Sequence, residues 1–375
     1  MYFYSSFERS PDDIEFINSC LDSRHVSRGI VNQRFETLHN EFFDSFCTLT
    51  SSGTTALFTA FNALQINSNS IIWTSPLNFC ATAHCSKLLG GALDFVDIEL
   101  NTFNISISRL KQKLLQAEKE GALPDLLVIV HLAGVVQPME EIKLLSEIYH
   151  FRVIEDACHS YGSFYANKSE PVGCALYSDI TVFSFHGLKT ISAGEGGLLS
   201  TKNEFYHEFI HNFINLGLVR GTQSEPWVVE SQTLGLNFRM SDINASLCLS
   251  QYFDLSRRRT RRIEQINLIH ALIDQDYMLL QASQPIVTYP FRHLAIVSIP
   301  SLTTLEQKAE FFRNCLNRGI RLSCHYKPIY QHPAFYDTNA QRKCANAEKY
   351  YIESFTIPAS LNMSDSDIEN TISII

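Results

Sequence analysis

Residues 155–197 read EDACHSYGSFYANKSEPVGCALYSDITVFSFHGLKTISAGEGG. An acidic pair ends one apolar run, FRVIEDA (151–157), and a second run, DITVFSF (179–185), leads into a loop that carries Lys189. Both runs are short and rich in β-branched and aromatic residues, so we predict two buried strands. Ligands of α/β sheets bind where such strands end. This stretch therefore predicts a site as well as a fold.

Strands and helices alternate around this stretch. The segments 70–75 (SIIWTS), 92–98 (ALDFVDI), 125–133 (DLLVIVHLA) and 196–201 (GGLLST) also read as strands. Amphipathic stretches at 81–89 and 138–149 read as helices between them. This alternation predicts an α/β fold with a mostly parallel central sheet that helices cover on both faces.

The length of 375 residues indicates two domains. We predict a large domain at 1–245 with an N-terminal arm. A long linking helix and a smaller C-terminal α+β domain would follow at 246–375. One helical run, from Ser241 to about Asp274, carries the basic cluster SRRRTRRIEQ (256–265), which we interpret as a solvated helix face.

Composition excludes several classes of protein. The net charge is −9, so a dominant nucleic-acid role is disfavoured. No apolar run approaches the ~18–20 residues of a membrane span, and the N-terminus lacks the pattern of a secretory signal. Ten cysteines are spaced irregularly without a CxxC pair, which indicates reduced thiols in a cytoplasmic protein and no structural zinc site.

Four separated stretches carry candidate chemistry. In SSGTTALFTAFNAL (51–64), a small turn before a helix offers amides to a phosphate, although an ordinary N-cap explains it equally well. Asp156 either faces a protonated ring nitrogen or is a capped structural residue. Lys189 can form a Schiff base if its amine is neutral, and we expect the glycines of GEGG (194–197) to let backbone pass close to a ligand. Arg239, in LGLNFRMSDINASL (234–247), suits a carboxylate or phosphate.

In this order and spacing, the four stretches resemble the DegT/DnrJ/StrS family of sugar aminotransferases, from about Ser10 to about Ser366. The resemblance implies the pyridoxal 5'-phosphate (PLP) fold type I, which is aspartate aminotransferase-like. It implies that Lys189 is the catalytic Schiff-base lysine and proton shuttle, and that Asp156 pairs with the pyridine nitrogen. The remaining cofactor residues that it implies are Gly53, Thr54, Phe79, His159, Ser184 and Asn237. Because Asn237 would reach the phosphate of the other subunit, a homodimer with shared active sites is expected.

The resemblance also implies a substrate. SFHGLKTISAGEGG (184–197) is similar to members that aminate C4 of a sugar, whereas C3-aminating members more often have Asp at position 195. The segments 226–242 and 324–336 resemble members from pseudaminic acid biosynthesis, which act on a UDP-linked 4-keto-6-deoxy-N-acetylhexosamine. A UDP- or dTDP-linked keto-sugar and glutamate are the implied substrates, used in ping-pong half-reactions. Residues expected near them are His186, Arg239, His325 and Tyr326.

Other functions remain open from the sequence. HEFIH (207–211) matches the zinc-peptidase pattern HExxH, with His207 and His211 on one helix face, but no third ligand is evident. A C3 sugar aminotransferase, or another PLP enzyme of this fold, fits most of the same residues. Dehydratases of the family replace the Schiff-base lysine with His, and Lys189 argues against that reaction. A non-enzymatic member would bind PLP without turning over an amino acid.

Overall fold

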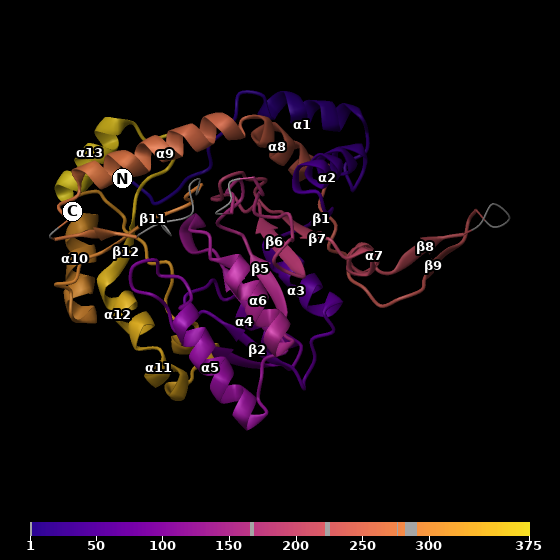
Figure 1. The fold of residues 1–375 in the computed structure, drawn as a ribbon. Coiled ribbons are helices and arrows are strands. Elements are labelled where there is room, and N and C mark those ends of the chain that lie inside the picture. Colours follow the sequence, from indigo (N-terminus) through magenta and orange to yellow (C-terminus); the bar gives the residue numbers. More distant parts are fainter. Residues whose placement is uncertain (1, 166–168, 222–225, 276, 282–290) are drawn as a thin grey trace.

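The computed structural model describes residues 2–165, 169–221, 226–275, 277–281 and 291–375. A seven-stranded sheet forms its centre, in the order β1-β7-β6-β5-β4-β2-β3 (Figure 1). Neighbours from β3 to β6 are parallel, while β7 is antiparallel to both β6 and β1. The strands are β1 (Phe46–Thr50), β2 (Ile71–Thr74), β3 (Ala92–Phe95), β4 (Leu126–Val130), β5 (Arg152–Asp156), β6 (Ile180–Ser184) and β7 (Gly197–Thr201).

The predicted α/β fold with a mostly parallel sheet is confirmed. All six predicted strands form, and each end lies no more than three residues from the expected one. The strand β1, with the sequence FCTLT, was not predicted; two residues separate it from the end of α2 (Ile30–Phe43). It pairs antiparallel with β7, with Phe46 opposite Thr201.

Helices cover both faces of this sheet because its central strands are apolar on both sides. In β4, Leu127 and Ile129 belong to one core, and Leu126 and Val128 belong to the other. Residues of α2, α5, α6 and α8 complete the first core, and those of α3, α4 and α7 complete the second. These helices, with α1, are α1 (Asp13–Asp22), α2 (Ile30–Phe43), α3 (Gly53–Ala63), α4 (Ala81–Leu88), α5 (Ile107–Glu120), α6 (Met139–Tyr149), α7 (Glu204–Phe213) and α8 (Asp242–Phe253).

The predicted helical run from 241 to 274 is two helices rather than one. Helix α8 ends at Phe253, and α9 (Leu255–Leu272) begins after Asp254. The carboxylate of Asp254 accepts hydrogen bonds from Ser10 and Arg257, which ties the junction to the N-terminal arm. Helix α8 packs against α1 and α2, whereas α9 packs against α13 (Asp365–Ile374). The division of the chain at 245/246 stays a prediction.

The basic cluster on α9 is not simply a solvated face, and that interpretation was wrong for two of its residues. Arg258 and Arg262 are buried. The Arg258 guanidinium donates to the backbone oxygen of Glu8 at 2.7 Å and to Ser10 Oγ at 2.9 Å. Arg262 donates to the backbone oxygen of Ala359. These two arginines therefore join the N-terminal arm and the C-terminal segment to α9.

The C-terminal region has a core of its own around a small antiparallel sheet, in the order β10-β11-β12. The predicted mixture of strands and helices is present, and the segment 319–330 joins it through single bridges, as between Ser323 and Thr356. The N-terminal arm lies against this region, since the Tyr2 amide donates to Gly319 O at 3.0 Å. The further elements here are β10 (Leu279–Leu280), β11 (Ala295–Ser298), β12 (Ser354–Ile357), α10 (Leu305–Asn317), α11 (Thr338–Lys343) and α12 (Ala345–Glu353).

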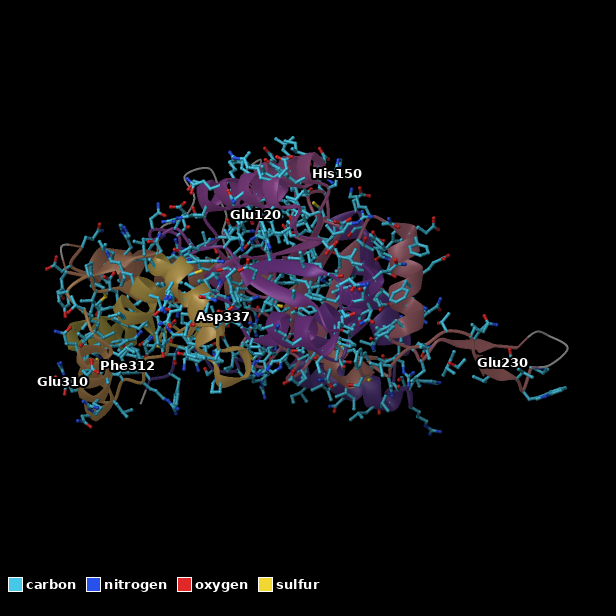
Figure 2. All side chains as sticks on the ribbon, turned by 90° about the horizontal axis from the view of Figure 1, so that it is seen from below. Glu120, His150, Glu230, Glu310, Phe312 and Asp337 are labelled. Carbon is cyan, nitrogen blue, oxygen red and sulfur yellow. The ribbon has the colours of Figure 1, made fainter. Side chains whose placement is uncertain are left out.

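A two-stranded hairpin, β8 (Leu218–Arg220) and β9 (Val229–Ser231), projects from the body of the molecule. Figure 2, which labels Glu230 on the hairpin, shows the same hairpin from a second direction. The hairpin segment exposes large apolar side chains, with Trp227 75% and Leu234 93% accessible. Within the described ranges, no helix is long and apolar enough to cross a membrane.

Candidate active site

A cavity of about 420 Å³ opens at the carboxyl ends of the central parallel strands. Val130, Asp156 and Ser184 line it, and they are the last residues of β4, β5 and β6. Parallel strands bring their carboxyl ends to one edge of the sheet, so these side chains meet although they are far apart in sequence. The N-terminus of α3 and the turn that carries Lys189 complete this end of the cavity.

The N-terminus of α3 lies at the cavity wall. Ser52 is the N-cap, and its Oγ accepts the Thr55 amide at 3.1 Å, so the ordinary capping role is real. The Gly53 and Thr54 amides belong to the first turn, which has no partners inside the helix. A Cβ at Gly53 would stand 2.7 Å from Ser184 Cβ, so only glycine lets this turn approach β6. The partial positive charge of the helix end suits a phosphate.

Asp156 places a carboxylate in the same cavity. Its side chain is 5% exposed, and its Oδ1 accepts the amide of Cys158 at 3.2 Å. A buried carboxylate is costly unless a donor or a positive charge faces it. The protonated nitrogen of an aromatic ring bound in the cavity would be such a partner.

Lys189 lies on a turn after β6, where its amide donates to His186 O at 2.9 Å. The Ser5 hydroxyl donates to Leu188 O at 3.2 Å, so the N-terminal arm braces this turn. Burial lowers the pKa of the Lys189 amine, while the nearby Cys158 and Asp156 act in the opposite direction. A lowered pKa increases the neutral fraction, which is the form that attacks a carbonyl group.

The GEGG loop is shaped by its protein neighbours. Asn244, near the start of α8, donates its amide to the backbone oxygens of Ala193 at 2.7 Å and Glu195 at 2.8 Å. A Cβ at Gly196 would come within 2.7 Å of a Met240 side-chain atom, and one at Gly197 within 2.4 Å of the Ser52 backbone oxygen. The expectation that these glycines make room for a ligand is therefore corrected at both positions, because protein atoms occupy the space.

Another part of the cavity lining, which we call its ring wall, consists of the aromatic and imidazole rings of Phe79, His159, His293, His325 and Tyr326. The ring of Phe79 is exposed in the cavity, with its centroid 5.9 Å from that of Tyr326. Burial, followed by the positive charge of Lys189, lowers the pKa values of His159 and His293 well below the ordinary range. The same causes lower the pKa of His325 to about 4. Near neutral pH this wall is therefore uncharged.

Most of the predicted site residues come together here. The cavity is lined by Gly53, Thr54, Phe79, Asp156, His159, Ser184, His186, Lys189, His325 and Tyr326. Asn237 and Arg239 are not among the described lining residues. Both lie at the base of the hairpin, where Arg239 Nη1 donates to Asn215 Oδ1 at 2.7 Å. Their predicted roles stay predictions.

Sequence reasoning missed other lining residues, namely Tyr4, Asn78, Cys158 and His293. Asn78 directly precedes the predicted Phe79, so its position in TSPLNFC was an available signal. Tyr4 and His293 carry no motif, and only the fold shows that the N-terminal arm and the segment before β11 reach the cavity. A lone histidine beside a short strand is usually structural.

The HExxH pattern lies on α7, outside the cavity. The His207 ring stacks on Phe46 with centroids 4.9 Å apart, and its Nδ1 lies 3.3 Å from Thr48 Oγ1. In the part of the chain that the structure describes, no group of three or more His, Cys, Asp or Glu residues is arranged to hold a metal ion. A catalytic zinc requires three protein ligands, so the peptidase alternative has no support here.

Comparison with known proteins identifies relatives along the whole chain. The model of the DegT/DnrJ/EryC1/StrS aminotransferase family matches residues 8–375. A UDP-4-amino-4,6-dideoxy-N-acetyl-beta-L-altrosamine transaminase from Campylobacter jejuni serotype O:2 is 30% identical over 371 residues, covering 98% of this chain and 94% of the relative. GDP-perosamine synthase from Escherichia coli O157:H7 is 28% identical over 359 residues, covering 94% and 92%.

Solved structures share the fold. Helicobacter pylori PseC, described as an aminotransferase involved in the biosynthesis of pseudoaminic acid, superposes with a TM-score of 0.88 at 24% identity, covering 100% of this chain and 97% of the other. The PLP-form of the sugar aminotransferase Spr1654 from Streptococcus pneumoniae gives 0.88 at 20% identity, with 100% and 97% covered.

Proposed function

The chain belongs to the DegT/DnrJ/EryC1/StrS aminotransferase family, and on that basis we propose that it transfers an amino group from glutamate to C4 of a nucleotide-linked 4-keto-6-deoxy sugar. One observation carries the proposal. The amine of Lys189, the carboxylate of Asp156 and the N-terminus of α3 line a single cavity. These are the three groups that a phosphorylated pyridine aldehyde needs, namely a nucleophile, a partner for the ring nitrogen and an anion site.

Pyridoxal 5'-phosphate is the cofactor of this family, and the residues present fit it. Gly53, Thr54 and Ser184 would hold the phosphate, because the first turn of α3 lies against the end of β6. Asp156 would keep the ring nitrogen protonated, and Phe79 would cover a face of the ring. The bound cofactor would act as an electron sink for the carbon that loses or gains a proton.

Lys189 would carry the proton in both half-reactions. As a free amine it would take the proton from the α-carbon of glutamate, and it would deliver a proton to C4 of the sugar in the second half. Its lowered pKa favours the neutral amine that the first step needs. The turn at His186–Lys189, braced by Ser5, would hold the amine at one place for both substrates. Ping-pong kinetics follow from two substrates that use one site in turn.

The sugar specificity is supported by relatives and by the cavity. The name of the Campylobacter jejuni relative denotes a 4-aminated nucleotide sugar, which favours C4 over the alternative C3. Glu195 lies at the cavity rim, with its Oε1 4.0 Å from His186 Nε2. His325 and Tyr326 supply uncharged polar groups to the wall, which suits a sugar linked to UDP or dTDP.

The glutamate carboxylate would need a positive charge from outside this cavity. Lys189 is the single Lys or Arg among the described lining residues. We propose that Arg239 and Asn237 of a second copy enter each site, so that the enzyme is a homodimer with shared active sites. The projecting hairpin segment supports this arrangement, because Trp227 and Leu234 expose apolar surface that a monomer rarely leaves in water.

The decisive experiment supplies the purified protein with PLP, glutamate and a panel of UDP- and dTDP-linked keto-sugars. We expect amination of a 4-keto-6-deoxy sugar, with the new C–N bond located by NMR. Amination only of 3-keto sugars would overturn the C4 assignment. A protein that converts cofactor with glutamate, yet aminates no sugar, would overturn the substrate class. Failure of the glutamate step itself would favour the non-enzymatic alternative.

A cytoplasmic location is also proposed, since all ten cysteines are free thiols.

A further inference from the structure

Three groups form a directed chain of hydrogen bonds at the cavity wall. The backbone amide of Ala133 donates to His159 Nδ1 at 3.2 Å. The other ring nitrogen of His159, Nε2, lies 3.1 Å from the hydroxyl oxygen of Tyr326. Distances alone leave the direction of the second bond open, but the first bond decides it.

The backbone amide of Ala133 can only donate a hydrogen bond, so His159 Nδ1 must be the acceptor and carry no hydrogen. A neutral imidazole then holds its proton on Nε2, and Nε2 donates to the oxygen of Tyr326. An imidazolium would carry hydrogens on both nitrogens, and its Nδ1–H would oppose the Ala133 amide. The lowered pKa of His159 agrees with the neutral form.

The short turn Leu132–Gly134 is built to aim this amide. Ala133 has φ 60° and ψ 13°, a left-handed conformation that a non-glycine residue adopts at a cost. At Gly134, φ is +88°, and a Cβ would stand 2.5 Å from Phe291 O and 2.8 Å from His159 O. The Ala133 oxygen also accepts the amide of His293 at 2.9 Å. The turn is thus fixed from two sides while its amide faces His159.

The hydroxyl of Tyr326 therefore receives one hydrogen bond and retains its own proton. The residue lines the cavity, and burial raises the pKa of its phenol well above the ordinary value, so the proton stays. A hydroxyl that already accepts a bond on one side is polarised to donate on the other. The neighbouring rings of His325 and Phe79 add no charge at neutral pH, which disfavours an anionic partner for the phenol.

We propose that the Leu132–Gly134 turn fixes the Nε2–H tautomer of His159, and that Tyr326 is thereby a hydrogen-bond donor to an uncharged oxygen of the sugar. The sugar part of this inference rests on the proposed function. His159 is a positioning residue in this role, because it acts through Tyr326. Tyr326 determines specificity, since a sugar with no acceptor at that point would leave its hydroxyl unpaired.

The tautomer is tested without any substrate or turnover. The chain is labelled with ¹⁵N in its histidine rings, and the His159 signals are assigned as those lost in His159→Gln. We expect Nε2 to carry hydrogen and Nδ1 to carry none, both with and without PLP. A protonated Nδ1, in the neutral or the cationic ring, overturns the proposal.

The role of Tyr326 is tested by separating the half-reactions. Tyr326→Phe should raise the KM for the accepted keto-sugar by about tenfold, which is the effect of one lost hydrogen bond. The rate of the glutamate half-reaction should stay within about twofold of the wild-type rate. His159→Gln, whose amide accepts from Ala133 and donates to Tyr326, should preserve most of the sugar affinity, whereas His159→Leu should not. Tyr330→Phe, in a tyrosine outside the cavity, is the matched control.

These outcomes separate two failures. If a keto-sugar is aminated and Tyr326→Phe leaves its KM unchanged, the donor role is wrong while the proposed function stands. If glutamate reacts and no sugar is aminated, the proposed function fails, and the sugar part of this inference fails with it. The ¹⁵N result still decides the tautomer in that case.

Discussion

Gly53 and Ser184 lie so close that a Cβ on the glycine would stand 2.7 Å from the Cβ of the serine. The first residue of α3 and the last residue of β6 thus meet with no space for a side chain between them. This contact brings two predicted phosphate-binding segments, distant in sequence, to one point.

Gly53→Ala should push these segments apart and weaken binding of PLP by about tenfold, because overpacking at a rigid contact costs on the order of 1–3 kcal/mol. Affinity is measured by titrating cofactor-free protein and following its absorbance. Gly187→Ala is the control, since a Cβ there meets nothing closer than 3.8 Å. Equal affinity in wild type and Gly53→Ala would contradict the phosphate site.

Lys189→Ala should abolish both the absorbance of covalently attached PLP and all turnover, because no other described lining residue has an amine. Lys143→Ala, in an exposed lysine of α6, should retain both. A Lys189→Ala protein that converts substrate at the wild-type rate would remove Lys189 from the mechanism.

The pH dependence of cofactor attachment reports the pKa of Lys189. Burial lowers this pKa, so the neutral amine persists to lower pH than in a free lysine, and attachment should fall with a midpoint below 10.5. The negative charge of Asp156 opposes that shift. Asp156→Asn removes the charge, and the midpoint should move further down. An upward shift in Asp156→Asn would show that another group controls the amine.

Shared active sites predict complementation between two inactive variants. Asn237→Asp would place a negative charge against the phosphate of the partner site, and Lys189→Ala removes the amine of its own site. In a mixed dimer one site combines Lys189 and Asn237 intact, so remixed chains should regain about one quarter of wild-type activity. A mixture of Lys189→Ala and Asp156→Asn chains should regain no activity, because the same chain supplies both residues to a given site.

The histidines of HEFIH should be dispensable for activity. His207→Phe keeps a ring to stack on Phe46, and it should leave turnover within about twofold, as expected of a substitution away from the cavity. Metal analysis should find no bound zinc, and treatment with a chelator should leave the activity unchanged. Loss of activity on chelation, restored by zinc, would revive the peptidase alternative.

Much of the fold was predictable because strands buried on both faces read as short apolar runs, as in DLLVIV before His131. The strand β1 was not, since its partner β7 is antiparallel and lies about 150 residues away along the chain, as expected of non-local pairing. The division of the helical run into α8 and α9 at Asp254 was also not predictable from the sequence. Its carboxylate is held by Ser10 from the N-terminal arm, a contact that helical periodicity cannot register.

The site was predictable where it follows strand ends. Asp156 and Ser184 end neighbouring parallel strands, and Lys189 follows at once. Tyr4 and His293 were not predictable, because their place at the cavity depends on how the N-terminal arm and the segment before β11 dock. The burial of Arg258 was missed for a similar reason, since its partners Glu8 and Ser10 lie at the other end of the chain.

The N-terminal arm also determines when during folding the cavity can exist. Tyr4 lines it together with Tyr326, and the Tyr2 hydroxyl donates to Asp367 at 2.8 Å. The arm and the surface on which it docks are 365 residues apart in the sequence, so they meet only when the C-terminal region is in place. The cavity is therefore complete only after the arm has docked, and the large sheet alone has no complete pocket to offer a cofactor.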